Sequence, residues 1–529
     1  FRSFPYMMTK VENYEGQQIP ELVASLRSSF ARGKTKSKEW RVQHLKAFLR
    51  MMTEGRPLLC EAMKKDLGKS TFEGFIMECN LVELEINHML SSLSSWMRPE
   101  RKSTNLLNIP GWSYLYPEPY GVALIMGAWN YPTMLTLLPL VGCIAAGNCA
   151  VLKAPSPKYT PNCSQVIKTL MDKYMDHEYF GVVTGERDAI AAVLDERYDV
   201  IFFTGSASLG KIVAAAAAKH LTPTVLELGG QNPTLVDRTA DLDLAAKRIL
   251  WGAMMNCGQT CLRPEYILVH EAVADMFVAK VRERIRDFYT EEPQKTEWFG
   301  RVPNVDILRR LGGLLEAAQP HIVHGGQVDE KELYIAPTVL DFKDIATYTE
   351  TAVAKDEVFG PILSVVRCPS MSDAMQYINR REKPLALYVF TGDKKLQKQI
   401  LAETSSGAVG INECVMHAAN PSLPFGGVGL SGMGAYHGRF SFDAFTHYKA
   451  VLHKPNQVVT DAWIRYPPYT PLKQKLLQLI QAPWLSWLTA IPILTLIGAG
   501  VAVVAVACST DLGRSCIRTA LLGLANQFN

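Results

Sequence analysis

The sequence lacks the marks of several broad classes of protein. Its 11 cysteines include no C-x-x-C pair, which disfavours a zinc site or a disulfide framework and favours a reducing compartment. The 55 basic and 51 acidic residues are mixed along the chain, without the basic, aromatic-interleaved block that nucleic-acid binding favours. The first ten residues contain no apolar segment like that of a secretory signal. We therefore expect no metal ion, no nucleic-acid partner and a globular region that faces the cytosol.

The order of the apolar segments predicts an α/β fold. Residues 20 to 100 carry apolar side chains at helical spacing, as at Leu45 and Phe48. From Gly121 onward, short runs rich in Val, Ile and Phe alternate with helix-length stretches, and a second such region covers residues 225 to 412. Strands separated by helices are typical of parallel sheets that are buried on both faces. Because 529 residues exceed what one core serves, we predict two parallel-sheet α/β domains in series.

The C-terminal segment has a different composition. Three prolines within residues 467 to 471 argue against a helix there and mark the end of the globular part. Residues 484 to 508 are uncharged, and as a helix they would rise ~37 Å, enough to cross the ~30 Å core of a bilayer. We predict a transmembrane anchor over these residues; the alternative is a buried core helix. Residues 472 to 480 place their apolar side chains on one face, which predicts an amphipathic helix suited to a membrane surface.

The segment N-C-G-Q-T-C-L-R-P-E-Y, residues 256 to 266, carries the first candidate for catalysis. Cys261 follows a predicted turn after a helical stretch, where backbone N–H groups lower the pKa of a thiol and favour a nucleophilic thiolate. The alternative is a buried cysteine that acts as a small hydrophobic residue. Cys257 lies four residues earlier, on the same face of a continuing helix, and we assign it to packing.

A second candidate lies in L-E-L-G-G-Q-N-P, residues 226 to 233. Glu227 has apolar neighbours on both sides in a predicted strand that ends in two glycines. Burial in such a place raises the pKa of a carboxyl group, which suits a general base. The alternative is an edge strand whose glutamate points to solvent.

These two segments belong to a longer set of motifs. Taken in order along residues 15 to 460, they resemble the aldehyde dehydrogenase superfamily, specifically the class 3 branch that includes membrane-bound fatty aldehyde dehydrogenase. The resemblance implies oxidation of an aldehyde to a carboxylic acid through a thiohemiacetal and a thioester on Cys261. It also implies that the Asn130 amide and the Cys261 backbone N–H stabilise the oxyanion, and that Glu227 activates the hydrolytic water. The other motifs are M-G-A-W-N-Y-P (126 to 132), F-T-G-S-A-S-L-G (203 to 210), E-V-F-G-P-I-L (357 to 363) and P-F-G-G-V-G-L-S-G-M-G-A-Y-H-G (424 to 438).

The resemblance also implies a site for NAD or NADP. F-T-G-S-A-S-L-G ends a predicted strand and begins a helix, whose first N–H groups suit a pyrophosphate. Lys153 matches a family lysine that bonds a ribose, and Glu357 and Phe359 match contacts to the nicotinamide half. Ser156 departs from the family, which often has a glutamate there that binds the adenosine 2′-hydroxyl. Because a serine does not repel a 2′-phosphate, the choice between NAD and NADP stays open. Within F-T-G-S-A-S-L-G we assign six residues to the coenzyme: Gly205, Ser206, Ala207, Ser208, Leu209 and Gly210.

The resemblance further implies a homodimer that acts on long, apolar aldehydes at the endoplasmic reticulum membrane. Strands near residues 103 to 118 and 440 to 453 would form its oligomerisation element. Two rival functions are a coenzyme A-dependent acylating dehydrogenase, which Glu227 disfavours, and a non-catalytic protein of the same fold, which Cys261 and Asn130 disfavour. The expected domains are a coenzyme-binding domain (15–102 and 119–223), a catalytic domain (224–415), an oligomerisation or bridging segment (103–118 and 416–455), a linker with the amphipathic helix (456–483) and the anchor (484–508).

Overall fold

The computed structural model describes residues 18–457 and 460–481, so the expected anchor at 484–508 lies outside the described residues. Within the described part of the chain, none of the helices is both long and apolar enough to cross a bilayer. Two compact units are present. One runs up to Met97 and again over Glu118–His447, and the other contains Arg98–Pro117 and the chain from Tyr448 onward.

The larger unit begins with helices, as the spacing predicts. Ser37 starts the longest of them by accepting a hydrogen bond from the Trp40 N–H, and Gly68 ends it with a left-handed φ of 63°. Leu45 and Phe48 are fully buried on its inner face. These helices are α1 (Ile19–Ala31), α2 (Lys38–Leu67), α3 (Thr71–Gly74) and α4 (Asn80–Trp96).

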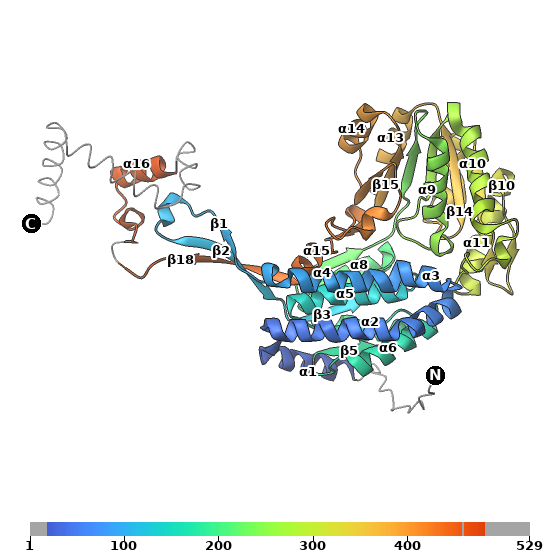
Figure 1. Cartoon of the computed structure of the whole chain (residues 1–529). Helices are drawn as coiled ribbons and strands as arrows, with labels where there is room; N and C mark the ends of the chain where they lie inside the picture. The colour runs from blue at the N-terminus through green and yellow to red at the C-terminus, as the bar shows by residue number, and fades with distance from the viewer. Residues whose placement is uncertain (1–17, 458–459, 482–529) are drawn as a thin grey trace, which may run out of the picture. The chain divides into compact units, whose positions relative to one another are not determined.

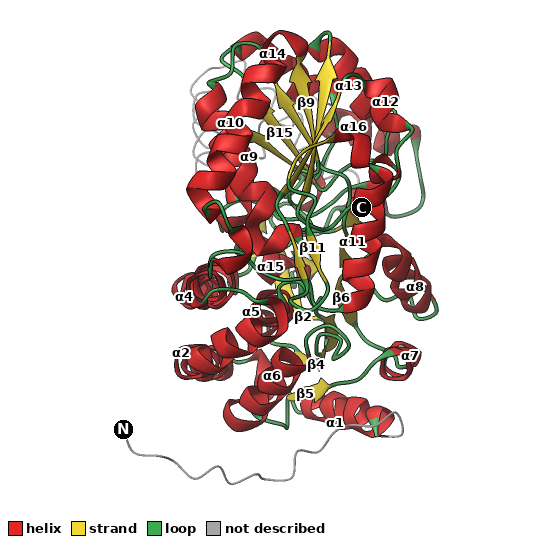
Figure 2. Cartoon of the chain, turned by 90° about the vertical axis from the view of Figure 1, so that its right-hand side faces the viewer, coloured by secondary structure: helices red, strands yellow, loops and turns green. Residues whose placement is uncertain are grey.

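The first sheet has six strands in the order β17-β7-β6-β3-β4-β5. The chain passes outward from β3 to β5 and returns to β6 on the other side of β3, which creates the switch point where such sheets bind ligands. Helices cover both faces, with α5 against β3 and β4 and α8 against β6 and β7 (Figure 2). The strands are β3 (Val122–Met126), β4 (Cys149–Lys153), β5 (Phe180–Val183), β6 (Val200–Thr204), β7 (Thr224–Glu227) and β17 (Gly432–Met433); the helices are α5 (Pro132–Ala146), α6 (Pro161–Tyr174), α7 (Arg187–Asp195) and α8 (Ala207–Ala218).

The second sheet has seven strands in the order β10-β13-β14-β9-β8-β15-β16, all parallel except β10. Helices again lie on both sides of it (Figure 2). The strands are β8 (Pro233–Val236), β9 (Tyr266–His270), β10 (Ile322–His324), β13 (Thr338–Phe342), β14 (Ile362–Cys368), β15 (Ala386–Phe390) and β16 (Ala408–Ile411), with a separate β11 (Val328–Asp329) and β12 (Tyr334–Ile335) pair; the helices are α9 (Leu242–Met254), α10 (Glu271–Tyr289), α11 (Val305–Ala317), α12 (Ile345–Thr349), α13 (Met371–Asn379) and α14 (Lys394–Glu403). Helix α15 (Arg439–Ala444) instead packs against α4 and α5, beside the first sheet.

The prediction of an α/β fold with two parallel sheets is therefore confirmed, but its details differ. Strand β7, which the expected boundary assigns to the second domain, pairs with β6 in the first sheet. Residues 432 and 433 return to the same sheet as β17, antiparallel to β7. Sequence periodicity does not reveal these pairings, because both follow from contacts between distant segments.

The smaller unit contains a three-stranded sheet in the order β1-β2-β18. Its strands are β1 (Glu100–Lys102), β2 (Trp112–Pro119) and β18 (Thr446–His453). The start of the expected strand at 440–453 is wrong, because residues up to Ala444 belong to helix α15. Pro471 begins helix α16 (Pro471–Ile480), so the last of the three prolines starts a helix, as the first helical position permits. Figure 1 marks these elements by label.

Candidate active site

A cavity of about 480 Å³ opens where the strands of the first sheet end. Its lining residues follow β3, β4, β5, β6 and β7, and others come from the second sheet's connections. Ten of the predicted site residues line it, whereas Ala207, Ser208 and Gly210 lie outside the lining. The ten are Asn130, Lys153, Ser156, Gly205, Ser206, Leu209, Glu227, Cys261, Glu357 and Phe359.

The chain reaches Cys261 through a tight left-handed turn. Helix α9 ends at Met254, and Asn256 and Cys257 both have a φ of 53°. At Gly258 a Cβ would lie 2.2 Å from the Gly360 carbonyl oxygen, so the turn requires glycine there. The expectation that Cys257 and Cys261 share one helical face is therefore wrong. Cys257 is buried, as a packing role requires, while Cys261 keeps exposed surface in the cavity.

The protein raises the pKa of the Cys261 thiol, and the expected depression is wrong. Burial is the largest cause, and the negative charges of Glu357 and Glu227 raise the pKa further. The backbone N–H groups of Cys261 and Leu262 act in the opposite direction, but they do not outweigh burial. A thiol held in this way needs a base that accepts its proton.

Glu227 meets the conditions for such a base. It ends β7, which lies between β6 and β17, so the edge-strand alternative is excluded. Its side chain is buried, and neither carboxylate oxygen has a hydrogen-bond partner among the described residues. Burial raises the pKa of this carboxyl well above its usual range, as the sequence predicts. A buried carboxylate without a partner is costly, and such groups gather at sites that use them.

Asn130 is held in place by contacts to its side chain and to its backbone. Its Nδ2 donates to the Gln259 carbonyl over 3.0 Å, which leaves the second N–H of the amide for a ligand. Its carbonyl accepts from Lys69 Nζ over 3.0 Å and from Asn256 Nδ2 over 2.7 Å. Lys69 also pairs with Glu78 over 2.6 Å, and both side chains are fully buried. The amide is thereby preorganised beside the turn that carries Cys261.

The coenzyme half of the cavity is built around the start of α8. Ser206 caps this helix by accepting a hydrogen bond from the Leu209 N–H, so the free N–H groups of the first turn, at Ala207 and Ser208, suit an anion. Gly210 faces elsewhere: a Cβ there would lie 2.6 Å from a Leu228 methyl, so this glycine allows helix packing.

Lys153 and Glu357 are buried at different strand ends. Burial lowers the pKa of Lys153 to about 8, and the Lys153 Nζ donates to the Ala154 carbonyl over 2.7 Å. Burial and the nearby Glu265 raise the pKa of Glu357 to about 8, and one oxygen of Glu357 has no hydrogen-bond partner among the described residues. The unpartnered carboxylate oxygens of Glu357 and Glu227 can accept hydrogen bonds from a polar ligand. The N–H groups at the start of α8 can bind a phosphate of that ligand.

A model described as the aldehyde dehydrogenase family matches residues 6–451. The chain belongs to the aldehyde dehydrogenase family. It is 44% identical to mouse aldehyde dehydrogenase family 3 member B2 over 86% of this chain and 93% of that protein. It is 42% identical to the rat protein named aldehyde dehydrogenase, dimeric NADP-preferring, over 85% of this chain and 98% of that protein. The substrate-bound structure of Staphylococcus aureus AldH has a TM-score of 0.84 and 38% identity, and covers 87% of this chain and 99% of that one.

These comparisons confirm the predicted family, its family 3 branch and an enzyme that oxidises aldehydes with NAD or NADP. Within this aldehyde dehydrogenase, Ser156 has a partner that the sequence did not indicate. Ser156 Oγ lies 2.8 and 2.7 Å from the two carboxylate oxygens of Glu186, a lining residue that follows β5. A negative group is therefore present beside this serine, although it comes from 30 residues further along the chain.

Further residues that the sequence did not single out also shape the site. Phe359, with a φ of 49°, packs edge-on against Trp129, and Trp129 stacks on Tyr159. The signal for Trp129 was present in the M-G-A-W-N-Y-P motif, directly before Asn130. The sequence gives less indication of the buried pair of Lys69 and Glu78, because a lysine and a glutamate nine residues apart in a helical region are ordinarily solvated.

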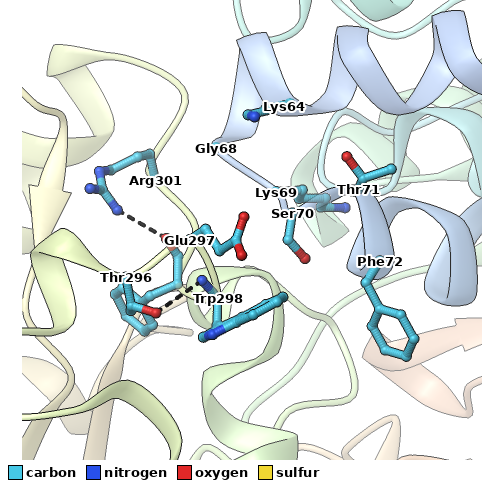
Figure 3. Close-up of a pocket in the computed structure, with 11 residues that line it drawn as sticks. Lys64, Gly68, Lys69, Ser70, Thr71, Phe72, Thr296, Glu297, Trp298 and Arg301 are labelled. Atoms are coloured by element: carbon cyan, nitrogen blue, oxygen red, sulfur yellow. Dashed lines mark hydrogen bonds between the residues drawn. The ribbon is translucent and has the colours of Figure 1, made fainter.

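Figure 3 shows a second cavity of this aldehyde dehydrogenase, of about 460 Å³. Ser70, in the loop after α2, and Phe72, in α3, lie on one side of it, and residues between 296 and 301 lie on the other. Lys69 Nζ is committed to Glu78 and to the Asn130 carbonyl. This second cavity therefore borders Lys69, which holds the backbone of Asn130 in place. We place the chemistry in the first cavity.

Proposed function

We propose that this enzyme oxidises long, apolar aldehydes to carboxylic acids, with Cys261 as nucleophile and Glu227 as general base. The observation that carries the proposal is the shared cavity: a cysteine with exposed surface and a buried, unpartnered carboxylate line it together. The raised pKa of each group fits the assignment, because Glu227 is a stronger base than an ordinary carboxylate and the thiol needs one.

The residues divide the reaction into two steps. Glu227 takes the thiol proton as Cys261 Sγ attacks the aldehyde carbon, which forms a C–S bond and an oxyanion. The Asn130 amide and the Cys261 N–H donate to that oxyanion. NAD or NADP, when bound at Lys153, Ser156, the start of α8, Glu357 and Phe359, supplies the hydride acceptor. Loss of the hydride leaves a thioester, and Glu227 passes the thiol proton to solvent. The restored carboxylate then deprotonates the water whose attack breaks the C–S bond and releases the acid, and Glu227 returns that proton to the Cys261 thiolate.

We propose further that the enzyme acts at a membrane, through a transmembrane helix over residues 484–508, with the catalytic part in the cytosol and the endoplasmic reticulum as the membrane. Apolar side chains on α16 support an adjacent interfacial helix, because Leu472 and Leu479 are 62% and 53% exposed. The dimeric rat relative and the strands β2 and β18 support a homodimer.

The test is a steady-state assay over a series of saturated aldehydes, with and without coenzyme A. We expect kcat/KM to rise with chain length, and coenzyme A to have no effect on product. Acyl-coenzyme A as the product would favour the acylating alternative, and a preference for short aldehydes would reject the long-chain assignment. Recovery of the full-length protein in a high-speed supernatant without detergent would reject the anchor.

A further inference from the structure

Glu186 forms a fixed carboxylate at the rim of the active-site cavity. Both of its oxygens lie within hydrogen-bond distance of Ser156 Oγ, at 2.8 and 2.7 Å. The Lys158 backbone N–H donates to Oε1 over 2.6 Å. Because one hydroxyl proton serves only one oxygen at a time, the pair keeps acceptor capacity for another donor. Glu186 is exposed and directly precedes α7, so it is held by these contacts and not by packing.

The strand order places Glu186 far from the reacting thiol. Glu227 ends β7, whereas Ser156 and Glu186 follow β4 and β5 at the other side of the sheet. From β7 to β5 there are four strand spacings, about 19 Å at ~4.8 Å each. A dinucleotide whose hydride acceptor lies beside Cys261 must therefore direct its adenosine half toward Ser156 and Glu186, past the start of α8.

Two lysines near this rim attract the Glu186 carboxylate, but each has another partner and the ammonium group of neither forms a hydrogen bond with it among the described residues. Lys153 is buried and donates to the Ala154 carbonyl. Lys158 forms an ion pair with Asp306 over 3.0 Å. Arg187 is exposed at the first position of α7 and is outside the lining of the cavity. The rim thus presents an acceptor that suits a hydroxyl group and opposes a second phosphate.

We propose that Glu186 selects NAD over NADP, by accepting a hydrogen bond from the adenosine 2′-hydroxyl and repelling a 2′-phosphate. Ser156 is a positioning residue that orients this carboxylate. The proposal rests on the coenzyme site described above. Glu186, which lies in a different loop, thus supplies the negative charge that position 156 lacks.

The test measures binding without turnover. Isothermal titration calorimetry of the full chain in detergent would give Kd values for NAD, NADP, 5′-AMP and 2′,5′-ADP. We expect the wild type to bind 5′-AMP and NAD more tightly than their 2′-phosphorylated counterparts. Glu186→Gln should shift the NAD/NADP affinity ratio toward NADP by about tenfold, the effect of about 1.4 kcal/mol of lost repulsion. The shift should diminish as salt is raised, because the site is exposed.

Two further variants show whether the shift in coenzyme preference comes from the Glu186 carboxylate itself. Glu350→Gln removes an exposed carboxylate that does not line the cavity, and it should leave the ratio unchanged. Ser156→Ala keeps the charge and should weaken NAD more than it changes NADP. An unchanged ratio in Glu186→Gln, or an equal shift in Glu350→Gln, would overturn the proposal. Failure of the wild type to bind any of the four ligands would instead reject the coenzyme site itself.

Discussion

The two ends of the active-site cavity hold carboxylates in opposite ways. At the catalytic end, Glu227 is buried and its oxygens have no hydrogen-bond partner within the described chain. At the other end, Glu186 is exposed and accepts hydrogen bonds from Ser156 and Lys158. Desolvation without partners raises the pKa of Glu227, whereas Glu186 is solvated and offers its oxygens to donors. The same functional group therefore suits proton transfer at one end and recognition at the other.

The largest expected effect comes from removing the nucleophile at the catalytic end. Cys261→Ala should lower kcat by at least about 10³-fold, because no other group forms the covalent intermediate, while coenzyme binding persists. Cys257→Ala, at the buried cysteine of the same turn, should retain most activity. Steady-state assays and coenzyme titration of both variants check this, and the reverse pattern would show that the nucleophile is misassigned.

The next effect tests the unpartnered carboxylate. Glu227→Gln should slow deacylation by about 10²- to 10⁴-fold, the range of general-base catalysis. Without Glu227 the thiol proton must pass to water, so acylation should also slow, but less than hydrolysis. Because hydride loss precedes hydrolysis, rapid mixing should still show about one equivalent of NAD(P)H per active site as a slowed burst, followed by much slower turnover. Normal steady-state turnover in this variant would remove Glu227 from the mechanism.

A third prediction concerns the support of Asn130. Lys69→Met leaves Glu78 buried without its partner and should cost about 3–5 kcal/mol of unfolding free energy, measured by denaturant titration. Lys69→Met combined with Glu78→Gln should recover much of that stability but not kcat, because the Asn130 carbonyl still lacks the Lys69 donor and keeps only Asn256. Lys64→Met, at an exposed lysine of the same cavity, is the control and should change neither quantity.

Properties of the site that depend on neighbouring residues in the chain can be predicted from the sequence, whereas those that depend on distant segments cannot. The apolar neighbours of Glu227 along its own strand predict its raised pKa, because the cause is local. The pKa of Cys261 was predicted in the wrong direction, since it depends on burial and on Glu357 and Glu227, which other segments supply. The Ser156 contact was missed for the same reason. The parallel sheets follow from local periodicity, whereas the left-handed φ at Cys257 depends on contacts made by the whole turn.

The smallest expected effect is on the pH dependence of stability. The folded protein raises the pKa of Glu227 above the value of about 4.3 expected in an unfolded chain. Between those two values the folded state binds a proton that the unfolded state has lost, so the wild type loses stability as pH rises. Glu227→Gln does not titrate, so its melting temperature relative to the wild type should increase from pH 5 to pH 8. A difference that is constant with pH would contradict the raised pKa.

The pairing of β7 with β17 has a consequence for biosynthesis. Gly432 and Met433 lie opposite Glu227 and Leu226, and the Leu228 N–H donates to the Ser431 carbonyl over 3.1 Å. The strand that holds the base is thus completed by residues translated about 200 positions later. A nascent chain that has already exposed its cysteine and coenzyme loops still lacks the strand that fixes its base. The strand that carries Glu227 can therefore acquire both of its neighbours only after residue 433 has emerged from the ribosome.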